Sequence, residues 1–147
     1  YLYANDLNNT IEYMWDNKLY GELVFYLEAC ESGSMFEGIL REDIKAYAIT
    51  AANAEESSWG TYCYPDDAIN GVHMGTCLGD LFSVVWMEDS DKQNIRAETL
   101  ETQFQYILKT TTLSHVQRYG HLGFKGEPVG NFQGNHDDVL VAPSTVS

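Results

Sequence analysis

The residues best suited to chemistry directly follow a run of apolar residues. Leu23–Leu27 is followed by Glu28 and then by Cys30, after which the chain turns through Ser-Gly-Ser at 32–34. Ligands of open α/β sheets bind at the carboxyl ends of the strands, so a cysteine there is placed to act as a nucleophile. Its backbone N–H is placed to bind an oxyanion. A buried, inert cysteine that ends a strand is the alternative interpretation.

The group that activates Cys30 is not in this segment. A reactive thiolate needs a base or a positively charged neighbour, whereas the nearest ionisable residues are Glu28 and Glu31, which are acidic. We therefore expect the activating group to lie elsewhere.

The elements that position Cys30 follow from the spacing of apolar residues. Runs at 23–27 and 43–50 predict strands that are buried on both faces. Helical segments are predicted at 6–19 (capped by Asn5 or Asp6 and ended by Gly21), 35–40, 77–87 and 99–113. The chain from Gly120 onwards predicts an edge strand or a loop that runs into a linker. This order indicates an α/β fold with a mostly parallel sheet. Because such sheets usually hold about five or six strands, we expect the missing strands to come from other sequence.

Composition excludes several classes of function. The 147 residues include 8 Lys and Arg against 22 Asp and Glu, a net charge of −14. The basic residues are scattered, which argues against nucleic acid or an anionic membrane as a partner. No apolar run is long enough to span a membrane, and no signal peptide is visible. We expect no metal and no cofactor, because neither the cysteines nor the histidines have the spacing of zinc ligands.

The three cysteines leave two interpretations open. Cys63 and Cys77 lie 14 residues apart around a loop-like stretch, and a disulfide between them would leave Cys30 unpaired. Three free thiols in a reducing compartment fit the spacing equally well.

Several longer motifs occur in a fixed order. They are EACESGSMFEG at 28–38, TAANAEESSWGTYC at 50–63, CLGDLFSVVWMEDSD at 77–91 and SHV at 114–116. Together they resemble the legumains, which are the asparaginyl endopeptidases or vacuolar processing enzymes of the C13 cysteine peptidase family. The resemblance covers about residues 1–120 and is strongest to the plant branch, in which a cysteine pair corresponds to Cys63 and Cys77.

The resemblance implies a caspase-like three-layer α/β/α fold and cleavage after Asn, more slowly after Asp. Cys30 matches the nucleophile, which would form a thioester with the substrate. The matching substrate-binding positions are Glu28, Ser57, Ser58, Trp59, Gly60 and Asp80. Carboxylates accept the two N–H donors of a carboxamide, which suits a pocket for Asn. Without the resemblance, the serines would be read as turn residues, Asp80 as a helix N-cap and Trp59 as a core residue.

One essential part of the family pattern is absent. The catalytic His of the family precedes the nucleophile, but the first histidine here is His73, and His115 is expected to be structural. We therefore expect 1–140 to be the second half of a peptidase domain whose first half supplies the base. Residues 126–134 are expected to form the last strand, and 141–147 to begin the linker to a removable C-terminal prodomain.

Three further expectations concern the reaction, the compartment and glycosylation. Relatives that favour ligation carry a bulkier residue at the position of Gly60, so hydrolysis is expected, with a peptide ligase or an inactive binding fragment as alternatives. A disulfide and strong acidity suit an acidic vacuolar or lysosomal lumen that is reached through the secretory pathway. Asn8, in the Asn-Asn-Thr sequence at 8–10, is a candidate for glycosylation.

Overall fold

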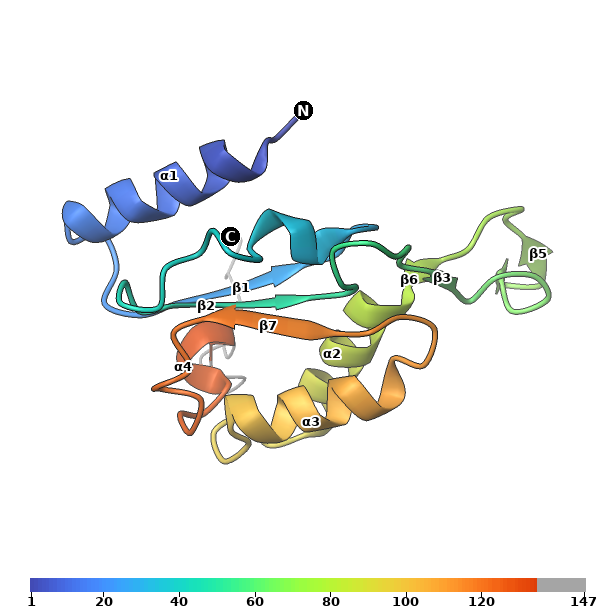
Figure 1. Cartoon of the computed structure of the whole chain (residues 1–147). Coiled ribbons are helices and arrows are strands. Elements are labelled where there is room, and N and C mark those ends of the chain that lie inside the picture. The colour runs from blue at the N-terminus through green and yellow to red at the C-terminus, as the bar shows by residue number, and fades with distance from the viewer. Residues whose placement is uncertain (135–147) are drawn as a thin grey trace, which may run out of the picture.

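A three-stranded sheet forms the centre of the structure, a computed structural model that describes residues 1–134. Its strands are β1 (Leu23–Leu27), β2 (Ala46–Thr50) and β7 (Gln117–Gly120). The order is β1-β2-β7, with β1 parallel and β7 antiparallel to β2 (Figure 1). The strands expected at 23–27 and 43–50 are thus confirmed, and the protein has a mixed α/β fold.

Helices lie on both sides of this sheet. The helix α1 (Ala4–Asp16) and the 3-10 helix η1 (Ser32–Met35) lie on one side, and α2 (Leu81–Lys92) and α3 (Leu100–Thr110) lie on the other (Figure 1). Alternate residues of β2 enter two separate cores because side chains alternate across a strand. Ala46 and Ala48 pack with the cluster that contains Ile11, whereas Tyr47 and Ile49 pack with the cluster contributed by α2 and α3.

The remaining strands form two short antiparallel ribbons. One joins β3 (Gly60–Thr61) to β6 (Gly79–Asp80), and the other joins β4 (Ala68–Ile69) to β5 (Val72–His73). The second ribbon projects from the body of the molecule (Figure 1). In the described part of the chain only β1 and β2 pair in parallel, so a mostly parallel sheet and the three-layer caspase-like arrangement stay predictions for the whole domain.

Several element boundaries differ from the expected ones. The first helix begins at Ala4 without a side-chain cap and ends at Asp16, before a left-handed residue at Lys18 (φ 56°). The second strand begins only after Lys45, which is also left-handed (φ 47°). A left-handed residue fits neither a right-handed helix nor an extended strand, so it ends the element.

The prediction that residues 126–134 form the last strand is wrong. This segment contributes one isolated bridge, between Thr99 and Pro128, and the short helix α4 (Gly130–Gln133). The edge strand is instead β7, which is polar in sequence. Its Arg118 lies over the Phe104 ring and pairs with Glu101 at 2.7 Å, and these contacts stabilise Arg118 in the strand. The domain end at 140 and the linker at 141–147 lie outside the described residues.

Asn8, the candidate for glycosylation, is buried in the folded chain. Its side chain is 3% exposed, and its amide nitrogen donates hydrogen bonds to the carbonyl oxygens of Ala4 (2.9 Å) and Met35 (2.7 Å). A glycan would attach to this same nitrogen. Asn8 instead ties α1 to the end of η1.

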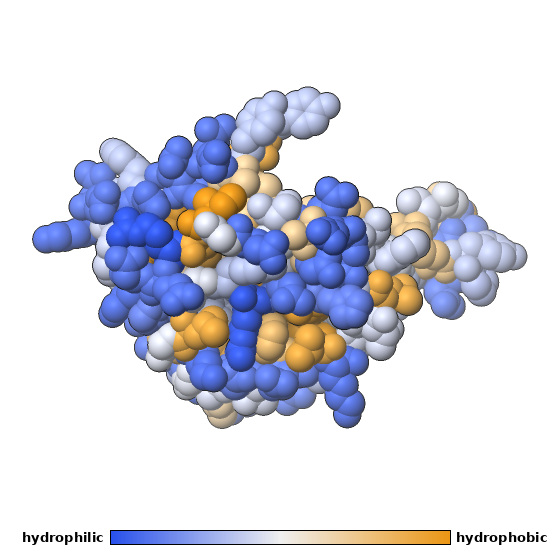
Figure 2. Space-filling model, in the orientation of Figure 1, coloured by the Kyte–Doolittle hydropathy of each residue, from blue (hydrophilic) through white to orange (hydrophobic). Residues whose placement is uncertain are grey.

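One face of the molecule is mainly hydrophilic. Figure 2 shows a largely hydrophilic face in which apolar side chains gather in small, separate patches. No helix within residues 1–134 has the length and apolar character needed to cross a membrane.

Two carboxyl groups, one buried and one partly buried, lie close together on the α2 and α3 side of the sheet. Asp89 on α2 is 2% exposed, and it interacts with Glu98, which precedes α3. Asp89 Oδ2 and Glu98 Oε2 are both buried without a hydrogen-bond partner in the described structure. Burial, followed by the charge and hydrogen bond of Asp89, raises the pKa of Glu98 to about 7. Burial also raises the pKa of Asp89, although Gln103 and Lys92 act in the opposite direction.

The protein should therefore lose stability as the pH rises from about 4.5 towards 7, because Glu98 ionises less readily in the folded state than in the unfolded chain. The variant Glu98→Gln is neutral throughout and should remove on the order of 1–2 kcal/mol of this loss, allowing for partial solvent exposure. Urea unfolding at several pH values measures the free energy of unfolding of each variant and its change with pH. The matched variant Glu42→Gln changes an exposed carboxyl and should keep the full loss. An unaltered pH dependence in Glu98→Gln would contradict the assignment.

Candidate functional site

Cys30 lies three residues beyond the end of β1 and is exposed with a free thiol. The alternative of a buried, inert cysteine is therefore wrong. Its Sγ lies 3.8 Å from the backbone oxygen of Ser58 and 3.9 Å from the Ser58 hydroxyl. Within residues 1–134 the backbone N–H of Cys30 donates to no acceptor. An exposed thiol beside an unpaired N–H is the arrangement that attack on a carbonyl group requires.

The turn after Cys30 has a constrained backbone. Glu31 is left-handed (φ 55°), an unfavourable conformation for a residue other than glycine, and its N–H donates to the backbone oxygen of Glu56 at 2.6 Å. A Cβ atom at Gly33 would lie 2.6 Å from the Tyr119 hydroxyl and 2.8 Å from the backbone nitrogen of Ala54, so only glycine fits. These contacts constrain the backbone directly after Cys30.

Glu56 holds the loop that faces Cys30. Its Oε1 accepts hydrogen bonds from the backbone N–H groups of Asn53 (2.9 Å) and His115 (2.6 Å), and its Oε2 lies 2.8 Å from His115 Nδ1. Partial burial acts to raise the pKa of Glu56, but these hydrogen bonds outweigh it and lower the pKa. Glu56 thus links the loop that contains Ser58 to the segment before β7.

A short ribbon brings Trp59 and Gly60 to the start of α2. Gly60 pairs with Asp80, and the N–H of Leu81 donates to the oxygen of Trp59 at 2.8 Å. Asp80 occupies the N-cap position of α2, as expected of an isolated Asp, but its side chain makes no capping hydrogen bond and is exposed. Trp59 is 53% exposed, so it is not a core residue.

Glu28 contacts the same end of α2. Its Oε2 accepts hydrogen bonds from the backbone N–H of Ser83 (2.9 Å) and from the Ser83 hydroxyl (3.0 Å). Ser83 lies three residues after Asp80, in the first turn of the helix. The segment between β1 and Cys30 is therefore connected through one carboxylate to the first turn of α2.

Most of the expected site residues thus contact one another or the start of α2. Cys30 contacts Ser58, Gly60 pairs with Asp80, and Glu28 binds the first turn of α2. Ser57 is exposed, and no contact of its side chain appears in the described residues. Sequence reasoning missed Glu56 and Ser83, although both lie inside the motifs, because neither residue type reveals which distant segment it will contact.

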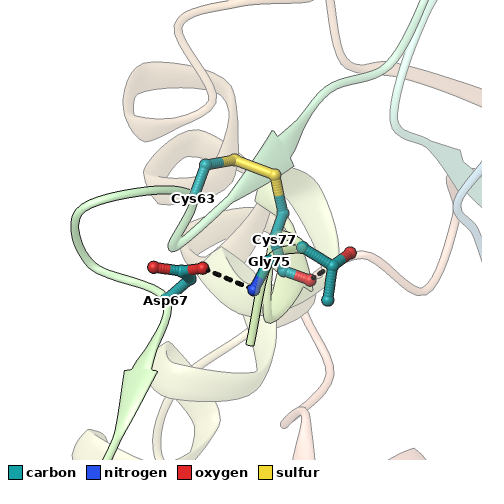
Figure 3. The surroundings of a disulfide bond; sticks show 5 residues. Cys63, Asp67, Gly75 and Cys77 are labelled. Atoms are coloured by element: carbon teal, nitrogen blue, oxygen red, sulfur yellow. Dashed lines mark hydrogen bonds between the residues drawn. A yellow bond between two sulfur atoms is a disulfide. The ribbon is translucent and has the colours of Figure 1, made fainter. Parts of the chain in front are cut away.

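A disulfide closes the base of the projecting ribbon. Cys63 and Cys77 are bonded, with their Cα atoms 4.0 Å apart, which confirms the expected pair (Figure 3). Asp67, 1% exposed, lies inside this loop and accepts from the Gly75 N–H at 2.9 Å, with His73 Nδ1 at 2.6 Å. The loop begins two residues beyond the end of β3, so the disulfide also constrains the ribbon that carries Gly60.

The three described histidines all contact groups other than Cys30. His73 contacts Asp67, His115 contacts Glu56, and His121 Nδ1 lies 2.7 Å from the backbone oxygen of Glu42. No three His, Cys, Asp or Glu side chains of residues 1–134 are grouped so that they could hold a metal ion.

Comparison with known proteins identifies the family of this chain. The model of the peptidase C13 family matches residues 1–135. The chain is 46% identical over 141 residues to a vacuolar-processing enzyme of Vicia sativa, with 92% of this chain and 28% of that protein covered. It is 47% identical over 133 residues to legumain of Mus musculus, with 90% and 29% covered. The chain therefore belongs to the peptidase C13 family, as its motifs indicated. It spans little more than a quarter of the length of these relatives.

The contacts of Glu56 should make it the main support of the loop at 51–58. Glu56→Ala removes three hydrogen bonds to a charged group and should lower the free energy of unfolding by about 2–3 kcal/mol. Glu55→Ala removes an exposed neighbouring carboxyl and should change it by less than about 0.5 kcal/mol. Chemical denaturation of both variants checks this, and equal losses would show that Glu56 has no special role.

Proposed function

We propose that this chain is part of a cysteine endopeptidase that cleaves after Asn, and more slowly after Asp. In the first step, Cys30 Sγ attacks the carbonyl carbon of the scissile bond, a thioester forms, and the amine leaves with a proton from a catalytic acid. Water then hydrolyses the thioester and regenerates the thiol. The observation that carries the proposal is the exposed Cys30 thiol, with its unpaired N–H, at the carboxyl end of β1.

The specificity follows from the polar groups around Cys30. Glu28 and Asp80 lie at the start of α2 and offer carboxylate oxygens to the N–H donors of an Asn side chain, while the Ser57 and Ser58 hydroxyls can donate to its carbonyl oxygen. A site of this kind discriminates against apolar side chains because its own polar groups would remain unpaired. The exposed ring of Trp59 would form a wall of the neighbouring subsite.

The base for this reaction would come from sequence outside this chain. The described histidines are engaged elsewhere, and β1 offers a place for another half of the domain. All five residues of β1 are only partly buried, although they are apolar, whereas all five of β2 are buried. In the described structure β1 pairs with β2 alone, so its other edge is open. An open apolar edge favours addition of a further strand. We propose that the first half of the peptidase domain pairs there and supplies the catalytic histidine.

The compartment and partners follow from the relatives and from chemistry. Several relatives are named vacuolar-processing enzymes. A disulfide and a net charge of −14 suit an acidic vacuolar or lysosomal lumen reached through the secretory pathway. The substrates would be peptides and proteins that carry Asn at the cleavage site, and a C-terminal prodomain would cover the site in the zymogen.

Hydrolysis is favoured over ligation by the surroundings of Gly60. A Cβ atom added there would lie 3.1 Å from both the Cβ and the Sγ of Cys77, so the disulfide leaves little room for the bulkier residue of ligating relatives. A ligase on the same scaffold and an inactive binding fragment remain the competing functions.

The full-length protein that contains this chain should hydrolyse a fluorogenic peptide with Asn before the scissile bond. Cys30→Ala should reduce kcat by at least about a thousandfold, because the nucleophile is lost. Ser34→Ala, a nearby exposed residue, serves as the control and should retain activity. An Asn-directed electrophile should also modify Cys30. Peptide turnover by Cys30→Ala, or by residues 1–147 alone at a comparable rate, would contradict the proposed mechanism.

Product analysis separates hydrolysis from ligation. With an added nucleophilic peptide near neutral pH, the wild-type protein should give mainly the hydrolysed acid, because position 60 is a glycine and not the bulkier residue of ligating relatives. Mass spectrometry measures the ratio of the two products. A predominance of ligated peptide would show that the enzyme is a ligase, and the absence of both products, with an unmodified Cys30, would favour a binding fragment.

A further inference from the structure

The two oxygens of the Glu28 carboxylate have different environments. Oε2 accepts two hydrogen bonds, both from Ser83, through the backbone N–H at 2.9 Å and the hydroxyl at 3.0 Å. Both donors belong to one residue in the first turn of a 12-residue helix, where unpaired N–H groups favour a negative charge. The two hydrogen bonds from Ser83 therefore fix the direction of Glu28 Oε2, and the start of the helix favours a negative charge on it.

The other oxygen has no partner. Glu28 Oε1 is buried, and no donor among the described residues reaches it. Buried carboxylate oxygens are nearly always hydrogen-bonded, because a carboxylate oxygen removed from water without a donor destabilises the fold. An unpaired buried acceptor two residues before the candidate nucleophile is suited to a donor that arrives with a ligand.

We propose that Ser83 is a positioning residue that holds Glu28 so that Oε1 accepts a hydrogen bond from the side-chain amide of the Asn that precedes the scissile bond. This inference rests on the proposed function and deepens it. By occupying Oε2 with two donors, Ser83 leaves one acceptor of fixed orientation for the substrate. A carboxamide supplies the matching N–H, whereas an ionised Asp side chain supplies no donor and is repelled by the carboxylate.

The Ser83 hydroxyl therefore contributes to the choice between Asn and Asp. Without the hydroxyl, one backbone N–H remains, and a single donor does not stop the carboxylate from rotating or from exchanging its two oxygens. The hydroxyl also stabilises the charge that repels an Asp side chain. Its loss should weaken Asn binding and relieve the exclusion of Asp, so the two substrates should respond unequally.

The full-length protein provides the test, with two peptides that differ only in Asn or Asp before the scissile bond. Ser83→Thr and Ser83→Val form a matched pair, because they have nearly the same shape and only Thr retains a hydroxyl. Ser83→Val should lower the Asn-to-Asp ratio of kcat/KM about tenfold, mainly through a higher KM for the Asn peptide, as expected for one hydrogen bond to a charged group. Ser83→Thr should keep the ratio within about threefold. Thr102→Ala, which removes a hydroxyl from the first turn of α3, should leave the ratio unchanged.

The outcomes separate the inference from the proposed function. Equal losses for both peptides in Ser83→Val would mean that Ser83 only supports the fold, and the inference would be overturned. The same follows if Thr and Val give the same ratio. If the wild-type protein cleaves neither peptide, the proposed function itself fails. Thermal unfolding of each variant shows whether α2 remains intact, and the Thr–Val comparison holds even if both variants are less stable.

Discussion

The parallel pairing of β1 with β2 is the constraint on which the candidate site depends. Because the two strands run in the same direction, the turn after β1 and the loop after β2 leave the same edge of the sheet. The pairing continues past the strands: Ala51 N–H donates to the Leu27 oxygen at 3.0 Å, and Gly33 N–H donates to the Ala52 oxygen at 3.1 Å. A further contact, from the Glu31 N–H to the Glu56 oxygen, stabilises a left-handed residue next to the nucleophile. A shift of this register would therefore separate Cys30 from Ser58 as well as weaken the sheet.

The carboxyl groups of this acidic chain have contrasting environments, which together favour a mildly acidic optimum of stability. Hydrogen bonds from Arg118, above all, and from Gln105 and Lys125 lower the pKa of Glu101 to about 2. A carboxyl with a lowered pKa stabilises the fold above its ordinary pKa, and this contribution fades as the pH falls towards 2. The raised pKa of Glu98 acts in the opposite direction and penalises the folded state as the pH rises towards 7. Near pH 5 the stabilising contribution of Glu101 is almost fully present, whereas the penalty from Glu98 has only begun.

The sequence predicts local features well and distant contacts poorly. The apolar run at 23–27 and the turn after Cys30 follow from short-range patterns, so both could be predicted. The edge strand β7 could not, because Arg118 becomes favourable there only through Glu101 and Phe104 on α3. Asn8 illustrates the same limit, since a sequence motif for glycosylation does not reveal that the side chain is buried. The motifs indicated Glu28 and Asp80 as candidate site residues, but only the folded chain shows that Ser83, in the first turn of α2, donates to Glu28.

The histidines show why the proposed activity would depend on assembly. Each described histidine is paired with an oxygen atom, and the hydrogen-bond contacts of Cys30 Sγ among residues 1–134 are with Ser58. Recruiting His115 as a base would break its contact with Glu56, which is also what holds the loop opposite Cys30. Among the described residues, His115 therefore could not act as the base without weakening the support of this loop. A base brought by a strand added at the open edge of β1 avoids this conflict, because that edge shares its carboxyl end with Cys30.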